Sequence, residues 1–298
     1  MKTACSRFAA VCGMFVLFAV TFAATSAEAA RVGVLSNNYA AATATDFAAK
    51  IAGHTFTGVD TSAVVPTLPA LQSAFDVLLV FEDGAYANAT AVGNVAAAFA
   101  SSGRAVVLGT FYDQDRSDVS NPALASQAHG WGALEAIDPN TTDGIGVRTD
   151  ASGVPNLPRV LNAASILQHP LTKGVAALAA TSGFAGGNQA KAGTIVLANW
   201  TELNAKSQPD PAIAYRTTGA ACVIQIGIAP DYAVGVGAGY ANFSGNFYVV
   251  WKNAFDFAAS SCLFASPIPA QSNGGIALTV LLMVAVAFTQ RRRPRGSV

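Results

Sequence analysis

The sequence predicts an α/β domain with a mainly parallel sheet flanked by helices. Short apolar segments rich in β-branched residues alternate with helical segments along the first half of the chain, as in sheets built from crossover units. Two of these segments are apolar at nearly every position, which is typical of strands covered on both faces. Of the 298 residues, 52% are hydrophobic and only 11% are charged, a composition that excludes intrinsic disorder.

The first four elements follow in order from the start of the domain. Arg31–Asn37 (RVGVLSN) predicts a strand, and Tyr39–Ala52 predicts an alanine-rich helix that Gly53 ends. Thr55–Val59 predicts a second strand. Leu68–Ala74 predicts a short helix, since prolines precede it and occupy its first turn.

The next three elements supply the most continuous apolar strands. These are Asp76–Phe81 (DVLLVF) and Ala105–Phe111 (AVVLGTF), with a helix expected between them over Ala89–Ser101. Gly103 suits the left-handed end of that helix. Alternating strands and helices of this kind join in parallel through right-handed crossovers, so we expect a flavodoxin-like arrangement.

The pattern is lost from Tyr112 to Leu161, a stretch rich in Asp, Asn, Pro and Gly that we expect to form a long excursion at the carboxyl edge of the sheet. Strands resume over Thr194–Asn199, Ala212–Arg216 and Ala221–Ile228, the last two as an antiparallel pair. A closing helix is expected over Gly245–Ser260. Its apolar positions form a stripe that predicts a core-facing helix: Phe247, Val250, Trp251, Ala254, Phe255 and Ala258.

Residues 1–29 predict a secretory signal peptide. Lys2 and Arg7 precede an apolar run over Phe8–Ala24, and Ala27-Glu28-Ala29 supplies the small-residue exit, so cleavage is expected before Ala30. The alternative is an uncleaved membrane anchor. The exported domain is then expected over 30–262.

The C-terminus has three parts. Residues 263–273 form a proline-containing linker, 274–290 a transmembrane helix and 291–298 a basic cytoplasmic tail. The uncharged part of the apolar run makes a helix of about 22 Å, short of the roughly 30 Å hydrocarbon core, so spanning requires snorkelling or thinning of the bilayer. By the positive-inside rule the arginines stay in the cytoplasm; they are Arg291, Arg292, Arg293 and Arg295.

This tail resembles bacterial C-terminal sorting signals of the IPTL-CTERM and PEP-CTERM kind. The resemblance rests on Ile268-Pro269, the short apolar helix and the arginine cluster; Ala270-Gln271 departs from the pattern. It implies processing by an exosortase-type membrane enzyme, and export to the cell envelope or surface. A eukaryotic interpretation stays open, because glycosylation-type triplets begin at Asn88, Asn140, Asn199 and Asn242.

The order of elements, together with the phrase His169–Val175 (HPLTKGV), resembles the class I glutamine amidotransferase-like superfamily and its secreted, noncatalytic, trehalose-utilisation-type members. Catalytic members carry a cysteine on the turn after a buried strand and a histidine at a later strand end. Here Phe111 stands at the first position, and the later strand ends in Ile228-Ala-Pro-Asp231 without histidine. Covalent amide chemistry needs both groups, so the resemblance implies a noncatalytic domain.

Cys222 and Cys262 remain once the signal segment is removed. Two cysteines in an exported protein favour one disulfide. The alternative is two separate thiols, with Cys222 acting as a small buried hydrophobe.

Carboxylates follow the two continuous strands, where ligands bind in open α/β sheets. They suit Ca²⁺ or Mg²⁺, and paired carboxylates also serve as acid and base in glycoside hydrolysis. Alternatively they solvate loops, cap helices and balance Arg104 and Arg116. The candidates are Glu82, Asp83, Asp113, Asp115 and Asp118.

Other chemistry has no signature here. The three histidines (His54, His129 and His169) lack metal-ligand spacing, and no nucleophile elbow, P-loop or dinucleotide motif is present. Without its terminal segments the chain has 11 Lys and Arg against 16 Asp and Glu, so nucleic acid is not an expected partner.

The leading hypothesis is therefore an exported envelope protein that is membrane-tethered or sorted. Its α/β domain is expected either to bind a ligand, such as an envelope polysaccharide or protein, or to have a structural role. No cofactor is expected apart from Ca²⁺. The rival hypothesis is a metal- or carboxylate-dependent hydrolase that acts on envelope glycans.

Overall fold

The computed structural model describes residues 29–83, 88–110, 130–141, 159–180, 185–204, 206–235 and 243–262. These ranges include about four fifths of the expected exported domain. The signal segment before Ala29, the sorting motif at Ile268-Pro269, the apolar run 274–290 and the arginine cluster lie outside them.

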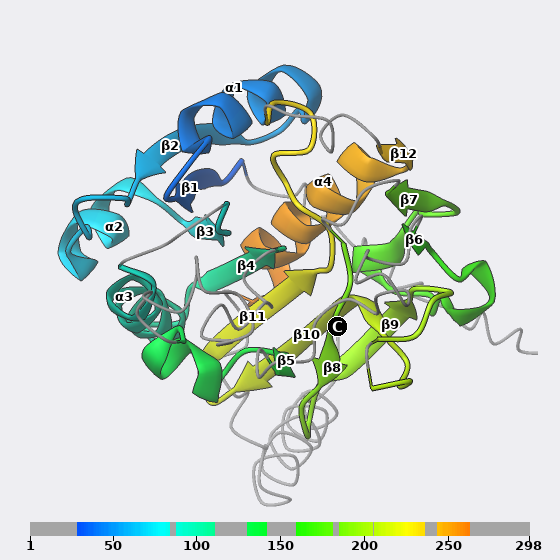
Figure 1. Cartoon of the computed structure of the whole chain (residues 1–298). Helices are drawn as coiled ribbons and strands as arrows, with labels where there is room; N and C mark the ends of the chain where they lie inside the picture. Colours follow the sequence, from blue (N-terminus) through cyan, green and yellow to red (C-terminus); the bar gives the residue numbers. More distant parts are fainter. Residues whose placement is uncertain are drawn as a thin grey trace, which may run out of the picture.

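A seven-stranded sheet forms the centre of the domain, in the order β2-β1-β3-β4-β11-β10-β9 (Figure 1). The first five strands in this order are parallel, and β10 and β9 continue the sheet in antiparallel pairing. The parallel part has the 2-1-3-4-5 order of flavodoxin-like sheets. The strand bounds are β1 (Arg31–Ser36), β2 (Thr55–Asp60), β3 (Val77–Val80), β4 (Ala105–Gly109), β9 (Ile195–Asn199), β10 (Pro211–Thr218) and β11 (Ala221–Ile226).

Helices cover both faces of the sheet and make three layers. On one face lie α1 (Ala40–Lys50) and α4 (Phe247–Phe257); on the other lie α2 (Leu68–Ala74) and α3 (Ala89–Ser101). Alternate side chains of each central strand enter opposite cores, so that Val77 and Leu79 of β3 pack with α1 and α4, while Leu78 and Val80 pack with α2 and α3. Burial on both faces explains why the strands are apolar at consecutive positions.

The α/β prediction is confirmed, and the predicted elements of the first half match the observed ones to within one or two residues. The antiparallel pair of β10 and β11 is also confirmed. Every apolar position of the predicted stripe on α4 and the turn after it is at most 1% exposed. Around Phe47 of α1, aromatic rings from β2 and α4 pack mostly edge to face, which fixes α1 against α4.

Short strands in the second half were not predicted. They form a three-stranded sheet of β12, β7 and β6 and a two-stranded sheet of β5 and β8. Each has only two or three residues, too few for a period-2 pattern to emerge from the sequence. Their bounds are β5 (Asn140–Thr141), β6 (Arg159–Val160), β7 (Leu178–Ala180), β8 (Gln189–Ala190) and β12 (Phe243–Gly245).

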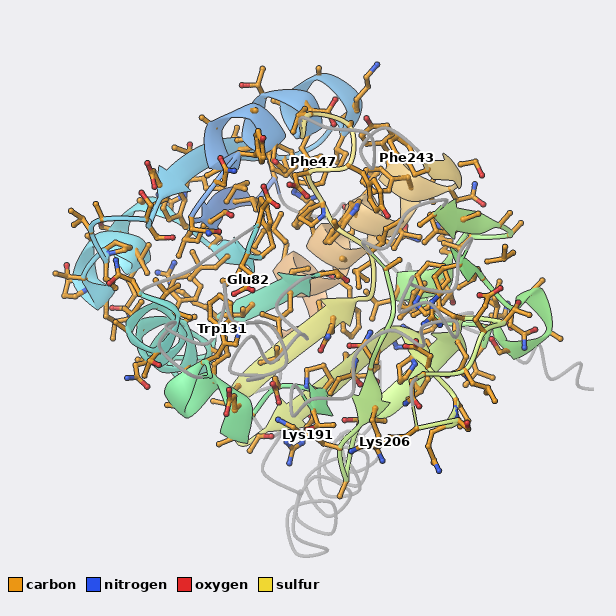
Figure 2. The ribbon with its side chains drawn as sticks, in the orientation of Figure 1. Phe47, Glu82, Trp131, Lys191, Lys206 and Phe243 are labelled. Atoms are coloured by element: carbon orange, nitrogen blue, oxygen red, sulfur yellow. The ribbon has the colours of Figure 1, made fainter. Side chains whose placement is uncertain are left out.

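Trp131 belongs to the core although it follows an irregular stretch of sequence. It is 2% exposed and lies beside α3, as Figure 2 shows. A Cβ atom at Gly93 of α3 would come within 1.8 Å of the Trp131 carbonyl oxygen, so only glycine lets the two segments approach. Leu134, in the short helix that follows, completes this contact.

Arg104 does not balance the strand-end carboxylates, contrary to one of the alternatives above. It precedes β4, so it lies at the amino edge of the sheet, where Nη1 is 3.8 Å from Asp76 Oδ1. Asp76 also pairs with Arg31 at 2.8 Å. Asp76 and the two described candidates, Glu82 and Asp83, are therefore at opposite edges of the sheet.

Cys222, at the start of β11, is disulfide-bonded. The turn over Ala258–Cys262 that continues α4 contacts β11, but the Cys262 side chain lies outside the described part of the chain. The pairing of these two cysteines stays a prediction.

Among the described residues, the helices are too short and not apolar enough for any of them to cross a membrane. The run predicted to do so, 274–290, is not among those residues.

We expect Cys222 and Cys262 to resist alkylation in the absence of reductant, and a peptide map to join them. Reduction should lower the free energy of unfolding by about 4 kcal/mol, because the bond closes a loop of about 40 residues. Intact-mass measurement after alkylation and urea denaturation with and without reductant test this. Alkylation of both thiols in unreduced protein would contradict it.

Candidate functional site

The candidate site lies at the carboxyl edge of the sheet, where the chain order reverses. The chain leaves β1 toward β2 on one side, and β3 pairs with the other side of β1. In open α/β sheets this reversal leaves a crevice beyond the strand ends, and ligands bind there. The residues that follow β1, β3, β4 and β11 therefore meet at one edge.

Asn37 joins the ends of β1 and β3. Its side-chain amide donates to the backbone oxygen of Asp83 at 2.8 Å, and its Oδ1 accepts from the Asp83 backbone nitrogen at 2.9 Å. Asn38 donates to the Asp83 carboxylate Oδ2 at 3.0 Å. These three bonds hold the Asp83 carboxylate at the reversal point.

A pocket of about 370 Å³ opens beside this clamp, between the end of β1 and the first turn of α1. Its polar lining residues are Ser36, Asn37, Asn38, Tyr39 and Asp60. α1 approaches β2 closely here, because Gly58 has no Cβ; an added one would lie 2.5 Å from the Cα of Ala41.

Glu82 and Thr110 lie deeper at the same edge. Glu82 follows β3 and is 3% exposed; Figure 2 places it in the middle of the molecule. Thr110 follows β4 and is fully buried, and its backbone nitrogen donates to Ile228 beyond β11. Its hydroxyl forms no hydrogen bond with the described residues. A buried hydroxyl of this kind costs about 1 to 3 kcal/mol unless a partner satisfies it.

Asp231 is brought over the end of β4 by a close contact. Pro230 rests on Gly109, where a Cβ would lie 2.6 Å from the proline ring, so the segment that carries Asp231 crosses the end of β4. Asp231 is 1% exposed, and among the described residues its Oδ2 has no hydrogen-bond partner. Burial, with the charge of Asp83 as a smaller cause, raises the pKa of Asp231 to about 7.

We call Asn37, Glu82, Asp83, Thr110 and Asp231 the strand-end site. Its chemistry consists of two buried carboxyl groups, one clamped carboxylate, an amide and a hydroxyl. Since Asp231 titrates near neutral pH, it can donate or accept a hydrogen bond there. Such groups recognise hydroxyl or amine hydrogens of a ligand.

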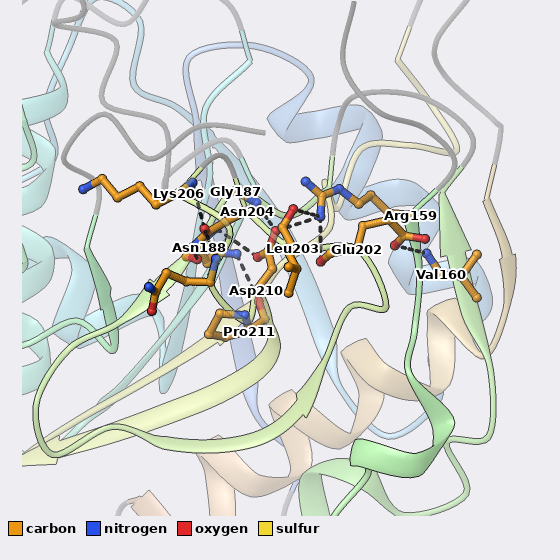
Figure 3. A network of polar contacts seen from close by, with 11 residues as sticks. Arg159, Val160, Gly187, Asn188, Glu202, Leu203, Asn204, Lys206, Asp210 and Pro211 are labelled. Carbon is orange, nitrogen blue, oxygen red and sulfur yellow. Dashed lines mark hydrogen bonds and ion pairs between the residues drawn. The ribbon is translucent and has the colours of Figure 1, made fainter. Parts of the chain in front are cut away.

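A second group of polar side chains forms a hydrogen-bonded network next to this site (Figure 3). Arg159 and Asp210 form an ion pair at 2.9 Å, and both side chains are fully buried. Asp210 also accepts from the backbone nitrogens of Gly187 at 2.7 Å and Asn188 at 2.9 Å. Arg159 Nη1 donates to the Glu202 carbonyl at 3.1 Å.

This network reaches the sheet through Asn188. Its side chain donates to the Pro211 carbonyl at 3.1 Å and accepts from Gln225 of β11 at 2.9 Å. Burial raises the pKa of Asp210 to about 6 despite the backbone donors and Arg159, which lower it. The network attaches β6 and the loops around Gly187 and Glu202 to β10 and β11.

The histidines have separate places. His169 shapes the turn before Pro170, as predicted: its Nδ1 accepts from the Leu171 nitrogen at 3.2 Å, and its ring stacks on Tyr215. It borders a separate hollow of about 840 Å³ formed by residues 166–174. His54 is buried near α4, and His129 lies outside the described residues.

Sequence reasoning found only part of the site. Glu82 and Asp83 lie at the expected edge, whereas Asp113, Asp115 and Asp118 are outside the described residues. Across the described ranges, no three His, Cys, Asp or Glu side chains are grouped to hold a metal ion. Asp231, Thr110 and Asn37 were missed. Asn37 and Thr110 could have been found from their position directly after a buried strand, whereas Asp231 lies five residues beyond β11 and has no such signal.

Comparison with known proteins finds similarity only in the arrangement of helices and strands. No family model matches the chain, and no curated protein matches it. Among solved structures, it is similar to a protein from Bacteroides uniformis described as ThuA-like, at a TM-score of 0.48 and 12% identity over 82% of this chain and 96% of that one.

Two further structures are similar at lower scores. The N-terminal domain of mmIFT52 has a TM-score of 0.44 and 9% identity, over 76% of this chain and 97% of that one. The β-galactosidase from Rahnella sp. R3 has a TM-score of 0.37 and 13% identity, over 67% of this chain and 29% of that one. The function of the strand-end site is therefore argued from the residues of this chain and not from these three structures.

We expect Asp231→Asn to flatten the pH dependence of stability. Between about pH 4, where an unfolded carboxyl titrates, and pH 7, the folded state holds a proton at Asp231 that the unfolded state has lost. The free energy of unfolding therefore falls as the pH rises through this range. The variant should be more stable than the parent at pH 8, by on the order of 3 kcal/mol.

Urea denaturation at pH 5 and pH 8 measures this. Asp210 titrates to the same effect up to about pH 6, so part of the slope should remain in the variant. Asp60→Asn, at an exposed carboxyl whose pKa is lowered, is the control and should leave the loss of stability above pH 5 in place. Equal slopes in the parent and Asp231→Asn would refute the assignment.

Proposed function

We propose that this protein is an exported cell-envelope protein, membrane-tethered or sorted, whose α/β domain binds a ligand noncovalently at the strand-end site. The observation that carries the proposal is the burial of two polar oxygens, Thr110 Oγ1 and Asp231 Oδ2, that have no hydrogen-bond partner among the described residues and lie beyond β4 and β11 at the carboxyl edge of the sheet. A fold selected for stability alone gains nothing from such groups, whereas a ligand with hydroxyl or amine groups satisfies them.

Support for export comes from the two ends of the sequence. A basic start, an apolar run and the Ala27-Glu28-Ala29 exit precede the domain, and an apolar run with a terminal arginine cluster follows it. Together they direct the domain out of the cytoplasm and hold it at the membrane until an exosortase-type enzyme acts at the motif around Ile268-Pro269. The partner is then an envelope polysaccharide or protein.

The proposal includes a relation to noncatalytic, trehalose-utilisation-type members of the glutamine amidotransferase-like superfamily. The His169–Val175 phrase and the order of strands and helices support this relation. Thr110-Phe111 and Asp231 stand at the two strand ends where catalytic members carry cysteine and histidine. Thr110, next to the first of these positions in the sequence, and Asp231 belong to the strand-end site here.

A hydrolase that acts on envelope glycans is the second candidate. The observation that favours it is the raised pKa of Asp231, to about 7, which burial causes first and the nearby Asp83 second. One carboxyl group that stays protonated near neutral pH beside another that is ionised is the arrangement glycosidases use. Turnover lost in Asp231→Asn with the fold intact would favour this candidate over binding alone.

We expect Thr110→Val to weaken ligand binding about 2- to 10-fold without loss of stability. Valine keeps the shape of the side chain and removes a hydroxyl that has no partner among the described residues, so the fold should lose little stability while the ligand loses one hydrogen bond. An array of envelope glycans identifies the ligand, and titration calorimetry compares the variants.

Thr45→Val is the matched control, because Thr45 is exposed on α1 and bonds only within its own helix. Melting with and without Ca²⁺ tests the cation separately. Unchanged affinity in both Thr110→Val and Asp231→Asn would place the ligand elsewhere.

A reporter fused after Val298 should give a cytoplasmic signal, because the arginine cluster stops transfer of the tail. A reporter fused after Cys262 should be exported. Paired alkaline phosphatase and fluorescent-protein fusions make the measurement. A phosphatase signal after Val298 would contradict the orientation, and a cytoplasmic domain would contradict export.

A further inference from the structure

The first residue of the expected mature chain is already part of the folded core. The Ala30 nitrogen donates to His54 Nδ1 at 3.2 Å, and its carbonyl accepts from the Thr55 nitrogen at 3.0 Å. Ala30 is 3% exposed, whereas Ala29 is exposed. The bond between these two alanines, where signal cleavage is expected, thus lies at the boundary of the folded domain.

The acceptor for the Ala30 nitrogen is rigidly held. The His54 side chain is 1% exposed, and its Nε2 lies 3.1 Å from Asp256 Oδ1 in the last turn of α4. Asp256 is paired in turn with Lys252 at 2.7 Å. The rings of Phe56 and Phe255 pack edge-on against the imidazole.

The residues after Ala30 have no free backbone edge. β1 pairs with β2 along one side and with β3 along the other, so both its edges are used. The Arg31 nitrogen donates to Asp76 Oδ2 at 2.9 Å. Val32, Val34 and Leu35 are at most 1% exposed. A protease that binds its substrate as an extended strand must first free these residues.

Freeing them is costly because β1 is not an edge strand. Its side chains enter both hydrophobic cores, so removal of β1 opens the contacts of α1 and α4 on one face and α2 and α3 on the other. Such an opening approaches global unfolding in free energy.

We propose that the Ala29–Ala30 bond is cleaved only before β1 enters the sheet, so that signal removal must precede folding, and that the new amino group then docks on His54. This inference rests on the proposed export. In the cleavage, water breaks the peptide bond, leaving its oxygen on the Ala29 carboxylate and both of its protons on the Ala30 nitrogen, which becomes an ammonium group. The freed nitrogen takes the place of the amide against His54 Nδ1.

In the experiment, purified signal peptidase is mixed with the full-length precursor in detergent. The precursor is tested in two states. In one the precursor is diluted from urea directly into the enzyme; in the other it is refolded first. Cleavage before Ala30, followed by mass spectrometry, should be at least 100-fold slower for the refolded precursor. Equal rates would overturn the ordering, and resistance in both states would instead contradict the proposed export.

Gly33→Val tests the role of β1 without altering residues 27–30. An added Cβ at Gly33 would lie 2.7 Å from the Phe75 ring, so the variant should loosen β1 and speed cleavage of the refolded precursor at least 10-fold. Val64→Ala, at a side chain that is 70% exposed, is the control and should leave the rate unchanged. Circular dichroism shows whether Gly33→Val still folds.

A second measurement stays informative if Gly33→Val does not fold. In the mature domain an amine-reactive label at pH 7 should modify the Ala30 amino group slowly. His54→Ala should speed that labelling severalfold while lysine labelling stays constant. An amino group labelled equally fast in both proteins would show that it does not dock on His54.

Discussion

The pairing of β1 on both its edges is the constraint on which the rest of the structure depends. Because β2 joins one side and β3 the other, the connecting helices must lie on opposite faces of the sheet, and both cores then form around the same strand. The reversal also opens the crevice where Asn37 meets Asp83. One topological choice thus positions both cores and the strand-end site.

Polar groups at the carboxyl edge are buried by the same packing that makes the strands apolar. Gly109 admits Pro230, which carries Asp231 over the sheet, and Thr110 is covered at the end of β4. These groups are kept from water although the fold does not use their full hydrogen-bonding capacity. The domain therefore gives up some stability at the edge where we propose that it binds.

The sequence was sufficient for the parts of the fold that are periodic and local. Burial makes strands such as DVLLVF apolar at nearly every position and gives α4 its apolar stripe around Trp251. These patterns are visible in the sequence, so they predict the strand and the helix directly. The short strands and the burial of Trp131 depend on partners far along the chain, which periodicity does not reveal. In the site, Glu82 and Asp83 were candidates because they follow a continuous apolar strand, whereas the segment that ends in Asp231 was considered only for its lack of a histidine.

The buried pair of Arg159 and Asp210 has a consequence for how such chains diverge. Loss of either partner leaves an unpaired charge in the interior and lowers the free energy of unfolding by about 3 to 5 kcal/mol. Replacement of both partners by apolar residues is tolerated. A single substitution at either of these two positions is therefore selected against. Distant homologues should keep or lose both together, and this covariation offers a way to detect them when overall identity has faded.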